Sequence, residues 1–148
     1  MHPIGAKKRF LKPLLLRLNA HMLDPAIPIY FPEGVTIEHV LPQRPKVTGP
    51  WIEKYPDVAR RKICTELLGN YAILTHPINA RAKNYDFTEK RRVIFSMTNG
   101  QAFPITNDLT NYVDWGESAL LQRHQKLVRV ACELLGLSPS ISWTAAAE

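Results

Sequence analysis

The seven residues from Ile37 to Gln43 constrain the fold of this chain more than any other stretch. They place a carboxylate, Glu38, and an imidazole, His39, between apolar residues, and Pro42 follows three positions after the imidazole. Proline lacks a backbone N–H and is rarely tolerated inside a sheet. We therefore predict a short strand over residues 35–39 that ends abruptly, with two chemically active side chains at its end.

A second ordered stretch follows after a gap. A helix is predicted from Asp57 to about Leu68, with Gly69 as its C-terminal cap. The apolar run 71–74 predicts a second strand, and His76-Pro77 predicts a turn. From Asn79 the chain is predicted to be helical, with a break near Tyr85-Asp86 and a continuation over residues 87–97.

The two ends of the chain are predicted to be helical as well. Residues 6–23 show apolar side chains at helical spacing opposite a basic face, which is typical of a packing helix and also of a helix on a membrane surface; packing is the favoured interpretation. Prolines make residues 24–34 a non-helical connector. A long helix is predicted over 116–135, capped by Asp114 and closed by Gly136, before a flexible tail at 138–148.

Composition limits the classes of function. The 148 residues suit one domain, and 19 Lys and Arg against 13 Asp and Glu give a net charge of +6, which favours an anionic partner. Cys64 and Cys132 form no CxxC pair, so neither a structural zinc site nor a disulfide framework is indicated, and a reducing cytoplasm is expected. The longest early apolar run, residues 14–16, is too short for a membrane span.

The order of His39, Asn70 and Asn79 resembles that of the HNH nucleases, also called His-Me finger or ββα-metal nucleases. More narrowly, "IEHVLPQ" followed by "LGN" and a later Asn is similar to the C-terminal nuclease domain of GmrSD-type modification-dependent restriction enzymes. The resemblance implies a mostly helical α+β fold in which helices surround a short two-stranded ββα-metal core. It implies a nuclease domain with a C-terminal helix over residues 35–137. Residues 1–34 then form either the end of a preceding domain or a segment packed on the core.

Chemistry and resemblance together suggest roles for four residues. His39 is the candidate general base, because an imidazole with a pKa of about 6.5 accepts a proton near neutral pH. Asn79 offers a hard amide oxygen that suits Mg²⁺ or Mn²⁺. The resemblance adds Glu38 as a second metal ligand and Asn70 as the residue that holds the segment of the base. A regular strand would send Glu38 and His39 to opposite faces, so a shared site requires a twist or bulge there.

Basic residues follow the proposed ligand. Arg81 and Lys83, and with less support Lys90, Arg91 and Arg92, are candidates for phosphate contacts. The alternative is a solvated helix face. Core packing is expected for Trp51, and His76 is close enough in sequence to Asn79 to reach the site.

The leading hypothesis is a metal-dependent endonuclease that hydrolyses DNA, with restriction of foreign or modified DNA as the role that the resemblance implies. Its expected partners are DNA and a nucleotide-hydrolysing domain or subunit that this chain does not contain; no membrane partner is expected. The alternatives are a non-catalytic nucleic-acid-binding module on the same scaffold and a helical domain whose basic faces bind an acidic protein.

Overall fold

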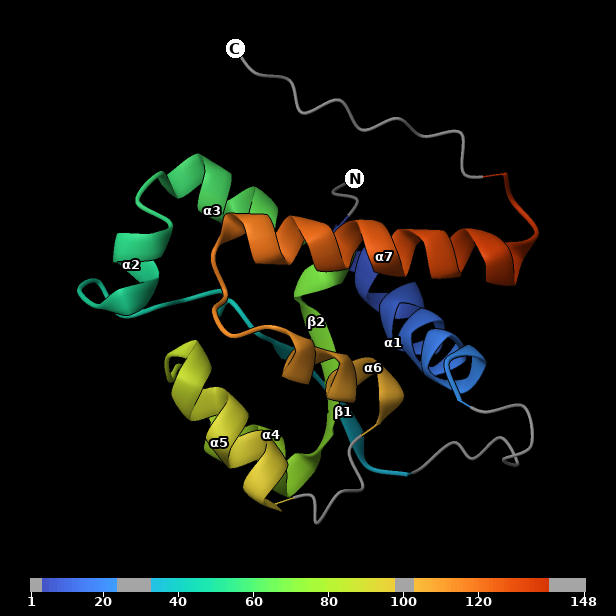
Figure 1. Cartoon of the computed structure of the whole chain (residues 1–148), viewed down its shortest axis with the longest axis horizontal. Helices are drawn as coiled ribbons and strands as arrows, with labels where there is room; N and C mark the ends of the chain where they lie inside the picture. The colour runs from blue at the N-terminus through green and yellow to red at the C-terminus, as the bar shows by residue number, and fades with distance from the viewer. Residues whose placement is uncertain (1–3, 24–32, 98–102, 139–148) are drawn as a thin grey trace.

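A computed structural model describes residues 4–23, 33–97 and 103–138. Within these residues the chain forms seven α-helices, two short 3-10 helices and one two-stranded antiparallel sheet (Figure 1). The predicted class, mostly helical α+β around a two-stranded core, is confirmed. Most of the predicted connector, from residue 24 to residue 32, lies outside the described residues, and so does the predicted tail from residue 139 onward.

The sheet joins two segments that are distant in sequence. β1 (Val35–His39) and β2 (Tyr71–Thr75) pair in an unbroken antiparallel register that runs from Val35 opposite Thr75 to His39 opposite Tyr71. The outer edge of β2 is covered by Thr106 in α6 (Pro104–Asn107), whose hydroxyl accepts from Ile73 N at 3.1 Å and donates to Ile73 O at 2.7 Å. This side chain satisfies backbone groups that an open sheet edge would leave unpaired.

Helices cover both faces of the sheet (Figure 1). α1 (Ile4–His21), α6 and α7 (Glu117–Leu135) bury one face in an apolar cluster. The buried members of this cluster are Leu15, Leu18, Val35, Tyr71, Ile73, Ile105 and Leu127. α4 (His76–Ala82) and α5 (Phe87–Met97) cover the opposite face, where Leu74, Ile78, Ala82 and Ile94 are buried. The side chains of β1 and β2 therefore alternate between two different helical layers.

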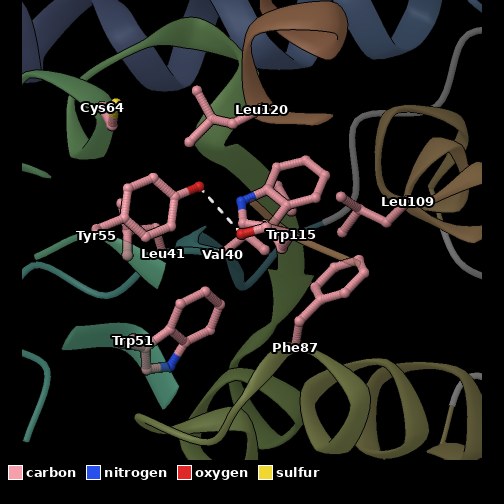
Figure 2. Packing of buried hydrophobic residues seen from close by; sticks show 10 residues of the cluster. Val40, Leu41, Trp51, Tyr55, Cys64, Phe87, Leu109, Trp115 and Leu120 are labelled. Carbon is pink, nitrogen blue, oxygen red and sulfur yellow. Dashed lines mark hydrogen bonds between the residues drawn. The ribbon is translucent and has the colours of Figure 1, made fainter. Parts of the chain in front are cut away.

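A third apolar cluster lies where β1 ends (Figure 2). It contains Val40 and Leu41, together with Trp51 from α2 (Pro50–Lys54) and Cys64 from α3 (Val58–Thr65). Trp51 is 4% exposed, which confirms its expected packing role. The hydroxyl of Tyr55 donates to Trp115 O at 3.0 Å. This cluster fixes the loop that follows the end of β1.

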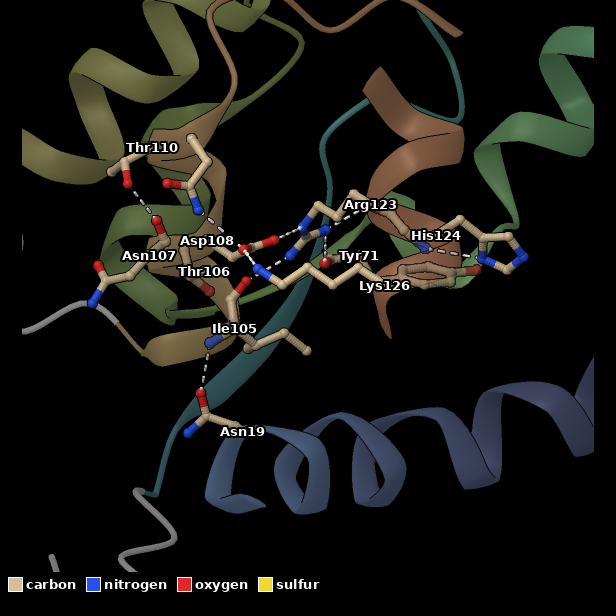
Figure 3. Close-up of polar contacts among 12 residues, drawn as sticks. Asn19, Tyr71, Ile105, Thr106, Asn107, Asp108, Thr110, Arg123, His124 and Lys126 are labelled. Carbon is tan, nitrogen blue, oxygen red and sulfur yellow. Dashed lines mark hydrogen bonds and ion pairs between the residues drawn. The ribbon is translucent and has the colours of Figure 1, made fainter. Parts of the chain in front are cut away.

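Arg123, which is fully buried, joins α7 to the turn before β2 (Figure 3). Its Nη1 donates to Gly69 O at 2.5 Å and to Tyr71 O at 2.8 Å, which are the carbonyls on either side of Asn70. Its Nε donates to Asp108 Oδ2 at 3.1 Å, so the guanidinium is both paired and hydrogen-bonded. Gly69 and Asn70 belong to the 3-10 helix η1 (Leu68–Asn70).

Several predicted boundaries are wrong, each for a local reason. α3 ends at Thr65, and Gly69 lies inside η1, where α7 approaches so closely that no side chain would fit. His76-Pro77 begins α4, because proline is well tolerated in the first helical turn. Asp114 pairs with Lys54, and Gly116 is the N-cap of α7.

Other elements complete the chain. Gly136 closes α7 in the left-handed conformation, as predicted. The short α2 and α6 and the 3-10 helix η2 (Asp108–Asn111) were not anticipated. Among the described residues, no helix combines the length and the apolar character needed to cross a membrane.

Candidate active site

Asn70 clamps the segment that follows β1. Its Oδ1 accepts from Leu41 N at 2.7 Å and from Trp115 Nε1 at 3.3 Å, and its Nδ2 donates to Leu41 O at 2.9 Å and to Thr65 O at 3.0 Å. The side chain is fully buried and uses both of its donors and two acceptor positions. Asn70 therefore fixes Leu41, two residues beyond His39.

Glu38 forms a buried ion pair with Lys90 of α5. Glu38 is 8% exposed and Lys90 is 1% exposed, and the ammonium also donates to His39 O at 2.7 Å. Burial raises the pKa of Glu38, and the charge of Lys90 opposes that rise. Burial likewise lowers the pKa of Lys90 against the attraction of Glu38. Burial and the attraction between the two charges thus act in opposite directions on both groups.

The position of Lys90 corrects the expectation that it contacts phosphate. Its ammonium is committed to Glu38 and to the backbone at the end of β1, so it is not presented at the surface. Lys90 lies on one helical face with Phe87 and Ile94, which are both buried. That spacing is the sequence signal which places this lysine inward.

Asn79 lies on α4 and binds β1. Its Nδ2 donates to Thr36 Oγ1 at 2.8 Å and to Ile37 O at 3.2 Å. Because a carbonyl only accepts, the amide nitrogen must face the strand, and Oδ1 turns away from it. Thr36 and Glu38 are two positions apart on β1 and share a face of the sheet. The structure therefore brings Glu38 and Asn79 to the same side of β1.

His39 leaves β1 on the opposite side from Glu38. The register of the sheet is unbroken up to this residue, so neither a bulge nor a shift redirects it. Its ring meets the ring of Tyr71 edge-on, with 4.8 Å between centroids, and its Nε2 is buried. The Tyr71 hydroxyl donates to Glu66 Oε2 at 3.1 Å, and burial raises the pKa of Tyr71. The predicted base therefore leaves β1 on the face opposite Glu38 and Asn79, and Asn79 binds the strand at Thr36 and Ile37, away from the end that carries His39.

The remaining basic candidates differ in accessibility. Arg81 and Lys83 are exposed at the end of α4. Arg91 is half-buried, lies over the Phe87 ring at 5.6 Å and donates to Thr110 O at 3.4 Å, so it packs against the protein. Arg92 is exposed and paired with Glu89. His76 is exposed at the first position of α4.

Two of the residues present have the chemical type that binds a cation such as Mg²⁺, although in this structure the Glu38 carboxylate is paired with Lys90 and Asn79 Oδ1 turns away from β1. A carboxylate and a carboxamide oxygen on one side of β1 are hard oxygen donors, as Mg²⁺ and Mn²⁺ prefer. No group of three or more His, Cys, Asp or Glu suited to a metal ion exists in the part of the chain that the structure describes. Two protein donors are enough for Mg²⁺, which usually keeps several of its waters.

A known protein family matches most of this chain. The family described as GmrSD restriction endonucleases, C-terminal domain, matches residues 6–130. Neither a curated protein nor a solved structure gave a match. The family match covers most of the chain and includes both strands, α4 and α5. The chain therefore belongs to the family of GmrSD restriction endonuclease C-terminal domains.

Proposed function

We propose that this domain is a metal-dependent endonuclease that hydrolyses phosphodiester bonds in DNA. The observation that carries the proposal is that Glu38 and Asn79 lie on one side of β1, with His39 adjacent to Glu38 in the chain and on the opposite face of the strand. Membership of a restriction endonuclease family and the net charge of +6 support a DNA substrate. Restriction of foreign or modified DNA is the corresponding biological role.

Each residue has a distinct part in the proposed reaction. Glu38, once Lys90 is displaced from it, and Asn79 would hold a divalent cation, which would stabilise charge on the phosphoryl and leaving oxygens. His39 removes the proton from the attacking water. Asn70 holds the segment behind His39 through both main-chain groups of Leu41. Arg81 and Lys83, exposed at the end of the helix that carries Asn79, contact the phosphates that flank the scissile bond.

The family also suggests the partner of this domain. Its description places such domains at the C-terminal end of restriction endonucleases. We propose that a nucleotide-hydrolysing domain or subunit selects the target, and that this domain cuts it.

A plasmid nicking assay with Mg²⁺ or Mn²⁺ tests the activity. Wild type is expected to nick, whereas His39→Ala and Asn79→Ala are expected to lose activity by roughly 10²- to 10⁴-fold. Lys62→Ala, which removes an exposed charge on α3, is the control and should retain activity. Cutting by both site variants at the wild-type rate would refute the assigned roles.

One observation favours a second candidate function, a nucleic-acid-binding module without catalysis. The ammonium of Lys90 already occupies the cationic position beside Glu38. If Lys90 is not displaced from Glu38, the scaffold binds DNA but no divalent cation. Calorimetric titration with Mn²⁺ separates the two functions: the nuclease is expected to bind the ion and Asn79→Ala to weaken that binding, whereas the binding module shows salt-dependent DNA binding alone.

A further inference from the structure

The imidazole of the proposed base lies against the ring of Tyr71. His39 and Tyr71 are opposite each other in the register of the sheet, and their rings meet at 66° with 4.8 Å between centroids. Aromatic rings attract each other in such an edge-on arrangement, and the attraction depends on their relative orientation. His39 is half-buried, whereas Tyr71 is 4% exposed. The buried ring is therefore the wall against which the more exposed imidazole is oriented.

Tyr71 is held at both ends. Its carbonyl accepts from Arg123 Nη1 at 2.8 Å, which fixes its backbone (Figure 3). Its ring belongs to the apolar cluster that α1, α6 and α7 bury, and its hydroxyl donates to Glu66 Oε2 at 3.1 Å. A hydrogen bond is directional, so it adds a restraint that apolar packing does not supply. Glu66 therefore fixes the outer end of the Tyr71 side chain.

Glu66 joins three segments of the chain. It follows α3 directly and is the C-cap residue of that helix. One carboxylate oxygen accepts from Tyr71 on β2, and the other, Oε1, accepts from Gln43 Nε2 at 3.1 Å. Gln43 lies four positions after His39, at the end of the stretch that begins with Ile37. The carboxylate thus connects the end of α3, the start of β2 and the loop that follows the base.

The exposure of this network argues against a purely structural role. Glu66 and Gln43 are both exposed, and the hydrogen bond between them is at the surface. Water competes for such a bond, so it adds little to the stability of the fold. The turn before β2 is already fixed by the buried side chains of Asn70 and Arg123. A network that adds little stability but sets the direction of a side chain is what a precisely oriented general base requires.

We propose that Glu66 is a positioning residue for His39. It fixes the hydroxyl of Tyr71, and the Tyr71 ring then holds the imidazole in one orientation, while Gln43 keeps the carboxylate in place. The inference rests on the proposed nuclease function, in which His39 is the general base. A catalytic group must be held within about 10–20° of its productive direction, and small misplacements lower the rate strongly. Glu66 acts through Tyr71 and needs no contact with the DNA or with a metal ion.

Steady-state kinetics of plasmid nicking test the proposal. Glu66→Ala removes the acceptor for the Tyr71 hydroxyl and is expected to lower kcat about tenfold, with KM changed less than about twofold. Tyr71→Phe keeps the ring but removes the hydroxyl, and kcat should fall about threefold or more. Glu66→Gln keeps an oxygen that accepts from Tyr71, so its kcat should stay within about threefold of the wild type. Glu53→Ala, which removes an exposed carboxylate on α2, is the matched control and should leave both constants unchanged.

A second readout follows the orientation of the rings without catalysis. Nuclear Overhauser effects between the ring protons of His39 and Tyr71 report their contact in the protein without DNA or metal. These effects should be strong in the wild type and in Glu66→Gln, and weaker in Glu66→Ala. The melting temperature of both Glu66 variants should stay within about 4 °C of the wild type, because the carboxylate is exposed.

Several results would overturn the positioning role of Glu66. Three of them concern Glu66→Ala alone: a wild-type kcat, a loss confined to KM, and unchanged Overhauser effects. Equal losses of kcat in Glu66→Ala and Glu66→Gln would make the charge, and not the hydrogen bond, the cause. Recovery of Glu66→Ala at higher Mn²⁺ concentration would make Glu66 a metal ligand, and a melting temperature lowered by more than the expected amount would make its role structural.

Plasmid nicking by the wild type separates failure of this role from failure of the nuclease itself. If the wild type nicks plasmid and Glu66→Ala nicks it at the same rate, the nuclease stands and the positioning role is refuted. If the wild type does not nick plasmid with Mg²⁺ or Mn²⁺, both proposals fail.

Discussion

The side chain of Asn70 binds both main-chain groups of Leu41, which lies two residues after His39. The same amide donates to Thr65 O, so one buried side chain joins the end of α3, the turn before β2 and the segment after β1. The orientation of the proposed base thus depends on a residue that need not touch the substrate.

Asn70→Asp tests this dependence. The carboxylate keeps the acceptor for Leu41 N but loses the donors to Leu41 O and Thr65 O, and it places a charge in a fully buried position. The expected loss in the free energy of unfolding is about 3 kcal/mol or more, measured by urea denaturation. Asn84→Asp, at an exposed residue with one hydrogen bond to Arg44 O, is the control and should change it by less than about 1 kcal/mol. Equal effects at the two positions would contradict the clamp.

The pair of Glu38 and Lys90 is expected to be costly to break. Lys90→Met leaves the Glu38 carboxylate buried without its cation. The free energy of unfolding, measured by urea denaturation, is expected to fall by about 3–5 kcal/mol. Adding Glu38→Gln removes the orphaned charge, so the double variant should be more stable than Lys90→Met alone. Arg92→Met breaks the exposed ion pair with Glu89 and should barely change the midpoint of urea denaturation. A double variant that is no more stable than Lys90→Met would contradict this account.

Gly69→Ala is expected to separate η1 from α7. An added Cβ would lie 2.5 Å from His124 N and 2.7 Å from Leu120 O, both of which are backbone atoms that cannot rotate away. The expected destabilisation is about 3 kcal/mol, read from thermal unfolding. At Gly116 the nearest atom to an added Cβ is the flexible Asp114 side chain at 3.4 Å, so Gly116→Ala should cost only the loss of a favoured N-cap residue, about 1 kcal/mol. Similar losses at both glycines would argue against the close approach of α7.

Acidification is expected to weaken the same contact. Burial lowers the pKa of His124 below its ordinary value of about 6.5, and Gly69 N donates to its Nδ1 at 3.4 Å. The folded state therefore binds fewer protons than the unfolded state, and stability falls as the pH drops below about 6.5. Urea denaturation between pH 7.5 and pH 5 should show a larger loss for the wild type than for His124→Gln. Parallel losses would show that His124 does not contribute.

Much of the secondary structure follows from local pattern. The apolar runs before Pro42 and after Asn70 predict both strands, because proline ends pairing and branched residues favour it. The break between helices at Tyr85-Asp86 and the end of α7 at Gly136 can likewise be predicted from neighbouring residues alone. The wrongly predicted end of α3 shows where local pattern fails. The sequence suggests Gly69 as a helix cap, but in the structure glycine is needed there because α7 leaves no room for a side chain. No feature within the segment itself contains that information.

By itself the sequence determined the two strands, the main helices and the order of His39, Asn70 and Asn79, because strand ends, helix periods and motif spacing depend on neighbouring residues. Only the tertiary structure decided that Lys90 neutralises Glu38, that Asn79 binds β1 through Thr36, and that no bulge brings Glu38 and His39 to one face of the strand. The physical reason is that a periodic pattern shows which side of an element is buried, whereas the partner of a buried polar group is set by how distant elements pack.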